Sequence, residues 1–324
     1  MKAMQVDRWC EPRDLQLVEL PAPTLQPGQV LIDVKTIGVN LADILMVQGK
    51  YQIRPPFPFA PGSEVAGSIR EVAPDVRGLE PGQRVLALLP YGAYASQVAV
   101  SAERVHVLPE KMTWEHAAAL TVVYHTSYFA LVYRAPVQPG QTLLVHGAAG
   151  GVGLAAVQIG KALGARVLAT AGSPEKRAFV VSQGAEAAYD SRDPSWVQEV
   201  LQATQGRGAD HIYDPVGGDV FDLSLKCIAF AGNLHVIGFA SGRIPTCAMN
   251  RVLLKNISLV GLHWGPYQDK DPAKIGEAMR ALFGMYERGQ LTIEVSATYP
   301  LERAAEALDQ ITTRKVQGKI VLTV

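Results

Sequence analysis

A glycine-rich segment lies at residues 146–153, where the sequence reads His-Gly-Ala-Ala-Gly-Gly-Val-Gly. It follows a short apolar stretch typical of a buried strand and precedes apolar residues at helical spacing. Gly150 and Gly151 let the backbone approach a pyrophosphate, and Gly153 lets the helix pack closely on the sheet. Ala148 replaces the first glycine of the usual fingerprint, and a tight turn without a ligand is the alternative. We expect the following residues to contact a dinucleotide, with the helix N-terminus facing its phosphates: Ala149, Gly150, Gly151, Val152 and Gly153.

The end of the next strand selects between the two nicotinamide cofactors. Sites for NAD usually place an acid about 20 residues after the glycine turn, where it holds the ribose 2′-OH. Gly172 stands near that position in this sequence and leaves room for a 2′-phosphate. Ser173 could donate a hydrogen bond, and Lys176 or Arg177 could pair with the phosphate. We therefore expect NADPH, and the alternative is a helix start whose charges are only solvated.

The elements around these residues change in character along the chain. Residues 1 to about 110 contain short apolar segments between Pro-Gly turns, a pattern typical of a β-rich domain. After Pro139-Gly140, strands alternate with helices, which predicts a parallel sheet covered on both faces. The fold class is therefore α/β, with a Rossmann doubly wound parallel sheet inserted into a β-rich catalytic domain. The expected boundaries are 1–124 and 264–324 for the catalytic domain and 125–263 for the Rossmann domain.

The composition excludes several classes of partner. The chain has 324 residues, with 30 basic against 30 acidic side chains, so we expect no nucleic-acid or membrane-surface binding. No apolar run reaches the roughly 18 residues that span a bilayer. The first residues resemble no signal or transit peptide, and three widely spaced cysteines favour a reducing compartment. We expect a cytoplasmic protein.

Several segments together resemble the medium-chain dehydrogenase/reductase superfamily, and most closely its zinc-free quinone oxidoreductase branch, the group of ζ-crystallin. The resemblance runs along essentially the whole chain, and it implies a GroES-like fold for the β-rich domain. It also implies a homodimer, in which strands near residues 234–260 pair across a two-fold axis. The segments that carry it are Gly38–Asp43, Pro61–Gly67, Ala148–Gly153, Asp214–Gly218, Gly238–Gly242 and Gly318–Leu322.

The sequence lacks the ligands of zinc-dependent relatives. Those relatives resemble this chain but carry metal ligands where Asn40, Ser63 and, by the resemblance, Val122 stand. A catalytic Zn²⁺ needs three protein ligands from Cys, His, Asp or Glu, so we expect no metal. Without a Lewis acid, alcohol oxidation is difficult, whereas quinones and conjugated carbonyl compounds accept hydride when they are oriented and their developing charge is stabilised.

The polar residues of the N-terminal domain are the candidates for that chemistry. The Asn40 amide could bond the substrate carbonyl or a water, or could only stabilise a turn. Asp43 could anchor the site or serve as an ordinary helix N-terminal acid. By resemblance to enoyl thioester reductases, Tyr51 stands at the position of a proton-donating tyrosine, although it could equally be a wall residue. We expect Glu64 to order the catalytic loop.

The resemblance assigns further residues to the cofactor. Thr126 resembles the residue that contacts the nicotinamide, or it only caps a helix. Tyr189 corresponds to an aromatic residue beside the adenosine phosphate, or it is a core tyrosine. The remaining expected cofactor residues lie at strand ends or in the final motif: Asn233, Gly238, Phe239 and Lys319.

Three functions remain open. The first is an NADPH-dependent quinone oxidoreductase with a small-molecule substrate, favoured by the apolar loop Pro55–Phe59. The second is an enoyl-CoA or enoyl-thioester reductase with Tyr51 as proton donor, for which Arg54 could contribute a basic lip. The third is a non-catalytic, crystallin-like protein that binds NADPH or RNA.

Overall fold

The computed structural model describes residues 1–324, which form two compact units. The catalytic unit combines Met1–Val122 with Ile293–Val324, and the nucleotide unit is the continuous segment Val123–Thr292. The chain therefore leaves the first unit once, builds the second, and returns, as an inserted domain requires. The return occurs later than the expected residue 264.

The catalytic unit contains most of the antiparallel structure. Its main sheet runs in the order β14-β15-β3-β4-β5-β7, with β6 also paired to β3, and β1 and β2 form a separate pair. Only β14 and β15 pair in parallel in the main sheet. The elements are β1 (Lys2–Gln5), β2 (Gln16–Glu19), β3 (Gln29–Val39), α1 (Leu41–Val47), β4 (Glu64–Val72), β5 (Arg84–Leu88), β6 (Gln97–Ser101), β7 (Val105–Val107), β14 (Val295–Pro300), α10 (Ala304–Thr312) and β15 (Lys319–Thr323), with 3-10 turns at Pro12–Asp14, Ala102–Arg104 and Leu301–Arg303.

The long strand β3 organises the core of this unit. Val30, Ile32 and Val34 alternate along it with residues of the other face and are buried in one hydrophobic cluster. The last strand, β15, pairs with the end of β3, so that Ile320 lies opposite Val39. Chain segments far apart in the sequence therefore meet directly before Asn40.

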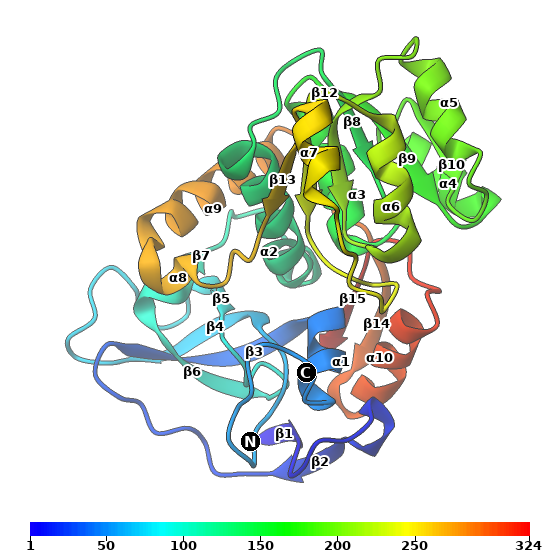
Figure 1. Ribbon diagram of the computed structural model, residues 1–324. Helices are drawn as coiled ribbons and strands as arrows, with labels where there is room; N and C mark the ends of the chain where they lie inside the picture. Colours follow the sequence, from blue (N-terminus) through cyan, green and yellow to red (C-terminus); the bar gives the residue numbers. More distant parts are fainter. The chain divides into compact units, whose positions relative to one another are not determined.

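The nucleotide unit is built on a six-stranded parallel sheet. The strand order is β10-β9-β8-β11-β12-β13. Strands β9 and β10 are added on one side of β8, and β11 to β13 are added on its other side, so the order switches between β8 and β11. Helices α3, α4 and α6 pack against its strands (Figure 1). The elements are a π-helical segment (Phe129–Arg134), β8 (Thr142–Val145), α3 (Gly151–Ala162), β9 (Arg166–Ala171), α4 (Pro174–Ser182), β10 (Ala187–Asp190), α5 (Trp196–Ala203), β11 (Ala209–Asp214), α6 (Gly218–Cys227), β12 (Ile228–Val236), α7 (Met249–Lys255), β13 (Ser258–Gly261), α8 (Tyr267–Lys270) and α9 (Pro272–Glu287); α2 (Trp114–Tyr128) crosses the boundary between the units.

Strand β8 is buried along its whole length, which agrees with its largely apolar sequence, Thr-Leu-Leu-Val. All four of its residues, Thr142–Val145, are buried. Helix α3 approaches this strand closely, because a Cβ on Gly160 would lie 2.6 Å from Leu143 Cδ2. The confirmed fold class therefore follows from strands that read as continuous hydrophobic runs between helices with one buried stripe.

The second boundary differs from the expected one because residues 264–292 pack within the nucleotide unit. The ring of Trp264 stacks on His125 at 5.3 Å, and Tyr267 meets Phe129 edge to face at 4.8 Å. Near the end of this segment, Thr292 exchanges hydrogen bonds with Gln158 of α3. The spacing of apolar residues in α9 indicates that one face of the helix is buried, but it does not indicate against which of the two units that face packs.

None of the helices is both long and apolar enough to cross a membrane. The cysteines Cys10, Cys227 and Cys247 are all free thiols.

Candidate active site and cofactor site

The glycine turn joins β8 to α3 in the way its sequence predicts. Gly147 has a φ of +57°, a conformation that favours glycine, and Ala148 N–H donates to the Thr170 carbonyl at 3.1 Å. A Cβ on Gly153 would lie 2.4 Å from the Gly147 carbonyl oxygen, so no larger residue fits there without a shift. The first helical bond runs from Leu154 to Gly150, which leaves the preceding N–H groups of the helix without helical acceptors. The turn therefore has the geometry of a phosphate cradle.

A buried histidine fixes the start of this turn. His146 Nδ1 and Nε2 each lie 2.9 Å from a hydroxyl, those of Thr170 and Ser224 respectively. Burial lowers the pKa of His146 to about 3, so the imidazole is neutral. These contacts tether the start of the turn to Thr170 of β9 and Ser224 of α6.

The loop after β12 reaches the same edge of the sheet as the glycine turn. Gly238 and Phe239 follow the strand, and Ala240 N–H donates to the Pro215 carbonyl at 3.0 Å. A Cβ on Gly147 would in turn lie 3.4 Å from Val216 Cγ2. The structure thus brings Gly238 and Phe239 close to the turn at the carboxyl edge, where open α/β sheets bind ligands.

Asn233 lies elsewhere. It is paired with His211 in β11, and His211 is in turn level with Leu143, two residues before β8 ends. Asn233 therefore does not reach the carboxyl edge, although it precedes the end of β12 by only a few residues. The regular pairing of β11 and β12 continues past Asn233 to Val236, an end of the strand that the sequence pattern did not locate.

The residues expected near the 2′-phosphate are already engaged with one another. Ser173 caps α4 by accepting from Lys176 N–H at 3.3 Å, and its hydroxyl lowers the pKa of Glu175. Arg177 forms an ion pair of 2.9 Å with Asp190 at the end of β10. These side chains lie at the end of β9 as expected, but they share the region with two carboxylates.

Tyr189 belongs to the core side of β10. It packs against the hydrophobic cluster that contains Trp196 and Leu168, and burial raises its pKa. Tyr189 is half-buried in this position. The next two residues lie closer to Gly172: Asp190 pairs with Ala171, and Ser191 Oγ is 3.6 Å from the position of a Cβ on Gly172.

Thr126 is buried on α2. Its neighbour Ser127 donates to the Val152 carbonyl at 2.8 Å and lies 2.9 Å from the Tyr213 hydroxyl. These contacts tie α2 to the helix that follows the glycine turn. Ser127 was not expected to have a role, because its partners lie 25 and 86 residues away in the sequence.

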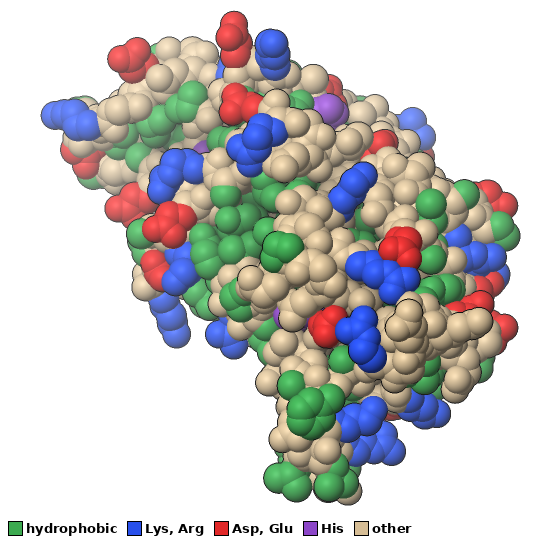
Figure 2. Space-filling model, turned by 90° about the horizontal axis from the view of Figure 1, so that it is seen from above, with side chains coloured by type: hydrophobic (Ala, Val, Ile, Leu, Met, Phe, Trp, Pro, Cys, Tyr) green, Lys and Arg blue, Asp and Glu red, His purple; other side chains and the backbone are tan.

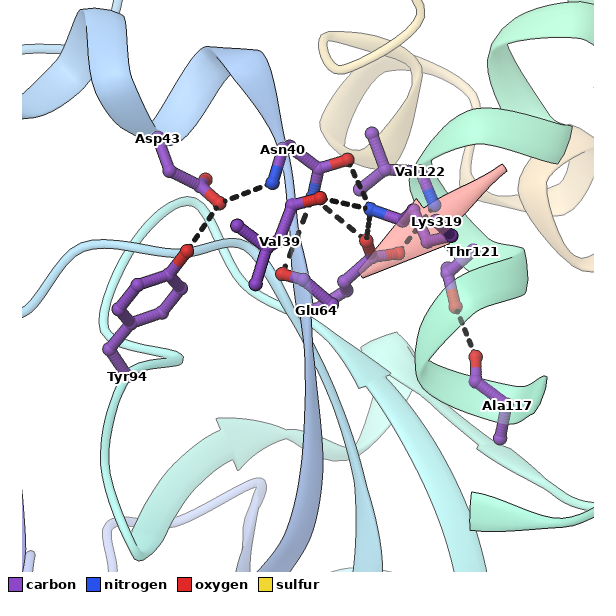
Figure 3. A network of polar contacts seen from close by, with 10 residues as sticks. Val39, Asn40, Asp43, Glu64, Tyr94, Ala117, Thr121, Val122 and Lys319 are labelled. Carbon is purple, nitrogen blue, oxygen red and sulfur yellow. Dashed lines mark hydrogen bonds and ion pairs between the residues drawn. The ribbon is translucent and has the colours of Figure 1, made fainter. Parts of the chain in front are cut away.

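A network of buried polar side chains surrounds Asn40 in the catalytic unit (Figure 3). Glu64 Oε1 accepts from Asn40 Nδ2 and from Lys319 Nζ, each at 2.8 Å. Glu64 Oε2 accepts from Val122 N–H at 2.7 Å. Both Glu64 and Lys319 are buried, so this is an ion pair inside the protein. The expectation that Glu64 orders the catalytic loop therefore has a structural basis.

Lys319 is fully committed within this unit. Its ammonium also donates to the Val39 carbonyl at 2.7 Å and to Asn40 Oδ1 at 2.6 Å. A lysine has three N–H donors, and all three have acceptors here. To donate a hydrogen bond to the cofactor, Lys319 would have to give up one of these bonds.

The close approach of β3 to Glu64 explains the glycine before Asn40. A Cβ on Gly38 would lie 2.2 Å from Glu64 Oε1 and 2.3 Å from the Ala118 carbonyl oxygen. Only a hydrogen fits between these oxygens. The segment that carries Gly38 and Asn40 is thus shaped around the carboxylate.

Asp43 begins a second branch of the network. Its Oδ2 accepts from Asn40 N–H at 2.8 Å, which caps α1, and from the Tyr94 hydroxyl at 3.0 Å. Burial raises the pKa of Asp43 to about 7, and Oδ1 has no hydrogen-bond partner. The half-buried Tyr51 has a raised pKa, first through burial and then through the charge of Asp43. Tyr51 and Asp43 are therefore electrostatic neighbours, as a shared site requires.

The positions of the missing zinc ligands lie together around Glu64. Asn40 and Val122 both bond this carboxylate, and Ser63 precedes it directly. They offer an amide, an isopropyl group and a hydroxyl in place of the ligands that Zn²⁺ prefers. The structure has no group of three or more His, Cys, Asp or Glu side chains placed to hold a metal ion.

Two family models match the chain. One, described as the alcohol dehydrogenase GroES-like domain, matches residues 26–110, and the other, described as a zinc-binding dehydrogenase, matches residues 151–282. The first match lies in the catalytic unit, and the second covers most of the nucleotide unit. Together with the observed sheets, they confirm the expected α/β fold with a GroES-like domain.

Full-length relatives point to one branch. The quinone oxidoreductase-like protein 2 homolog of Nematostella vectensis is 39% identical over 301 residues, covering 92% of this chain and 82% of the relative. Quinone oxidoreductase of Homo sapiens is 32% identical over 325 residues, covering 99% of this chain and 97% of the relative. The solved structure of Escherichia coli quinone oxidoreductase complexed with NADPH has a TM-score of 0.94 at 28% identity, with 100% of each chain covered.

Proposed function

Because the chain belongs to the quinone oxidoreductase branch of the medium-chain dehydrogenases/reductases, we propose that it reduces a quinone or a related α,β-unsaturated carbonyl compound with NADPH. The observation that carries this proposal is the Asn40–Glu64–Lys319 network, which stands where zinc-dependent relatives hold metal ligands. A site built from these groups has no Lewis acid for alcohol oxidation, but it can orient an acceptor that is already electron-poor.

The nucleotide unit fits NADPH. The cradle that excludes a Cβ at Gly153 and the positive φ of Gly147 suit a pyrophosphate at the start of α3. Arg177 and Arg192 provide cations beside Gly172 for a 2′-phosphate. When bound, NADPH supplies the hydride, and every other task falls to the side chains of this chain.

The Asn40 amide is held in one orientation. Its Nδ2 donates to Glu64 at 2.8 Å and to the Gly38 carbonyl at 3.5 Å, and its Oδ1 accepts from Lys319. Oδ1 keeps a second lone pair, because an amide oxygen has two. Asn40 is therefore suited to accept from a water or from a hydroxyl formed on the product, rather than to donate to a substrate carbonyl.

Tyr51 is the group we propose for protonation or oxyanion stabilisation. Its raised pKa keeps the hydroxyl protonated, so that it can donate to an enolate oxygen or to the phenolate that forms from a quinone. The charge of Asp43 opposes ionisation of Tyr51, which keeps the proton available.

An aromatic cluster favours a flat substrate. Trp9 meets Phe57 edge to face at 4.6 Å, and Phe57 stacks on Phe59 at 5.7 Å. Trp9 also packs on Gly49, two residues before Tyr51, because a Cβ there would lie 2.6 Å from the indole. The cluster therefore adjoins the loop of Tyr51, and its exposed rings Trp9 and Phe57 suit a planar aromatic acceptor.

An enoyl-thioester reductase is the second candidate, and it is favoured by the half-buried Tyr51, whose pKa burial and then the charge of Asp43 raise, so that its hydroxyl stays protonated. Steady-state rates with NADPH should be compared for 1,4-benzoquinone, 9,10-phenanthrenequinone and crotonyl-CoA. We expect a larger kcat/KM for the quinones. A crotonyl-CoA rate that exceeds them and falls at least about a hundredfold in Tyr51→Phe, the size of a general-acid contribution, would favour the thioester reductase.

We also propose a homodimer as the functional form. Strand β13 pairs only with β12 and leaves its other edge unpaired. Helix α7, which packs beside β12, exposes apolar side chains to solvent, a feature typical of an interface. The most exposed large apolar residues of the nucleotide unit are Phe230, Ile244, Met249, Leu253 and Leu254.

We propose a small-molecule substrate and no nucleic-acid partner. The formal net charge is zero, and blue basic and red acidic side chains are interspersed on the face shown in Figure 2. A duplex or single strand of nucleic acid is bound mainly through a concentration of positive charge. The free cysteines and the reduced state they favour support the cytoplasm as the compartment.

A further inference from the structure

Asp190 lies at the carboxyl end of β10, next to the end of β9. Sites for NAD usually carry an acid at the end of the strand that β9 represents, and this chain has Gly172 there. Asp190 is the last residue of β10 and lies in register with Ala171, the last residue of β9. The next residue, Ser191, brings its Oγ within 3.6 Å of the position that a Cβ on Gly172 would take. The turn after β10 therefore borders the space proposed for the 2′-phosphate.

Two arginines bind the Asp190 carboxylate. Arg192 donates from Nη2 to Oδ2 at 3.0 Å and from Nε to Oδ1 at 3.1 Å, the two-point geometry of a strong pair. Arg177, from α4, contributes an ion pair without a hydrogen bond, with its buried Nη1 2.9 Å from Oδ2. The hydrogen bonds from Arg192, above all, hold the pKa of Asp190 well below its usual range. The carboxylate is therefore ionised throughout the physiological range.

The charges at this edge cancel. Lys176, Arg177 and Arg192 bring three positive charges, and Glu175, Asp190 and, on the same loop, Asp193 bring three negative ones. Both arginines also lower the pKa of Glu175, so that acid lies within their field. A 2′-phosphate carries up to two negative charges and would have to share these guanidinium groups with the carboxylates.

We propose that Asp190 sets the cofactor selectivity of this chain: it occupies Arg177 and Arg192 as an internal anion, which the 2′-phosphate of NADPH displaces on binding. NADH lacks that phosphate and can bind with the Asp190 pairs intact. The preference for NADPH is consequently smaller than two unoccupied arginines would give. This inference rests on the proposed dinucleotide site, but not on the identity of the substrate.

The test compares 2′,5′-ADP with 5′-AMP, because these probes differ only in the 2′-phosphate. Their dissociation constants should be measured by calorimetry on the full chain, at one ionic strength, for the wild type and each variant. We expect Asp190→Asn to bind 2′,5′-ADP about fivefold more tightly with 5′-AMP unchanged, since the loss of one competing charge is a modest effect at a partly exposed site. We expect Arg192→Gln to bind 2′,5′-ADP about tenfold more weakly.

The matched control is Asp193→Asn. Asp193 lies on the same loop and accepts from Ser195 N–H, a bond that an asparagine oxygen can replace. This variant removes one negative charge without touching the arginine pairs, and we expect no change in the ratio of the two affinities. Asp190→Ser serves as a second variant if Asp190→Asn unfolds, and thermal melts establish that each variant is folded.

Three results would overturn the inference. Weaker binding of 2′,5′-ADP by Asp190→Asn would mean that the carboxylate positions the arginines for phosphate instead of competing with it. An equal gain in Asp193→Asn, or an equal gain for 5′-AMP, would mean that only general charge matters. If the wild type bound neither probe, the proposed dinucleotide site itself would be wrong, which is a separate and recognisable failure.

Discussion

Lys319 and Asn40, which lie 279 residues apart in the sequence, are joined by a hydrogen bond of 2.6 Å from Nζ to Oδ1. The ammonium is held in turn by Glu64, so a strand at the end of the chain orients an amide near its beginning. This bond links the pairing of β15 with β3 to the orientation of a candidate active-site residue.

The Glu64–Lys319 pair should dominate the stability of the catalytic unit. Lys319→Met leaves the buried Glu64 carboxylate without its cation, and we expect a loss of about 3–5 kcal/mol in the free energy of unfolding. Urea denaturation followed by circular dichroism measures this loss. Lys315→Met, at an exposed position near the same strand, is the control and should change stability by less than about 0.5 kcal/mol. Equal effects of the two substitutions would contradict the structural role of the pair.

Asp43 should make stability fall as the pH rises. Its pKa is raised from 3.8 to about 7 in the folded protein, so folding is favoured when the carboxyl group is protonated. This contribution is fully present below about pH 4 and is lost as the pH rises through 7. Asp43→Asn keeps an oxygen that can accept the Asn40 and Tyr94 hydrogen bonds. We expect this variant to flatten the dependence of the free energy of unfolding on pH between pH 5 and pH 8. Urea melts of the variant and the wild type across this range measure the difference. A wild-type profile parallel to that of the variant would show that Asp43 is ionised at neutral pH.

The buried histidines of the nucleotide unit act with the opposite sign at lower pH. Burial lowers the pKa of His146 and of His235 to about 3 from 6.5, so the unfolded chain takes up protons first as the pH falls. Their stabilising contribution is present above pH 6.5 and is lost toward pH 3. The comparison of Asp43→Asn with the wild type isolates Asp43, because both proteins contain these histidines.

The glycine turn should be sensitive to a single methyl group. Gly153→Ala places a Cβ about 2.4 Å from the Gly147 carbonyl oxygen, and the turn must shift to accept it. We expect NADPH binding to weaken about tenfold or more, since a displacement of about 1 Å in a binding loop is costly. The control is Gly276→Ala in α9, where a Cβ meets only the flexible end of Arg280, and this change should leave binding unaltered. Fluorescence titration with NADPH would detect the difference, and unchanged binding by Gly153→Ala would argue against a phosphate cradle.

The proposed dimer should depend on α7. Leu253 and Leu254 are each 74% exposed in the single chain, so charging them should cost little in folding but prevent an apolar interface. We expect the double variant Leu253→Glu/Leu254→Glu to have the mass of one chain by light scattering, and the wild type that of two. Leu17→Glu, an exposed position on β2, should remain dimeric. A monomeric wild type would refute the proposal.

Local patterns predicted the parts of the fold that depend on local sequence. The glycine turn and the alternation of strands and helices were recognised because each has a periodicity or a conformation that few residues satisfy. The expected contact residues Gly153 and Phe239 lie at the carboxyl edge, because each follows the end of a strand of the parallel sheet. These features required no knowledge of tertiary contacts.

Placements that depend on register or on distant contacts were not predictable in this way. Asn233 was expected at a strand end, but β12 continues to Val236, and Asn233 pairs with His211, level with Leu143 in the middle of β8. Lys319 was assigned to the cofactor by its motif, whereas its three donors point at Val39, Asn40 and Glu64. The role of Arg192 depends on the pairing of β10 with β9, which no local pattern reveals.

The most direct test of the account is NADPH oxidation by a quinone in metal-depleted enzyme. The protein should be dialysed against EDTA, its zinc content measured, and its turnover of 1,4-benzoquinone with NADPH compared before and after. We expect kcat/KM to be unchanged at negligible zinc content, because Asn40, Ser63 and Val122 stand at the positions of the missing ligands. Activity that is lost on dialysis and restored by stoichiometric Zn²⁺ would contradict the account.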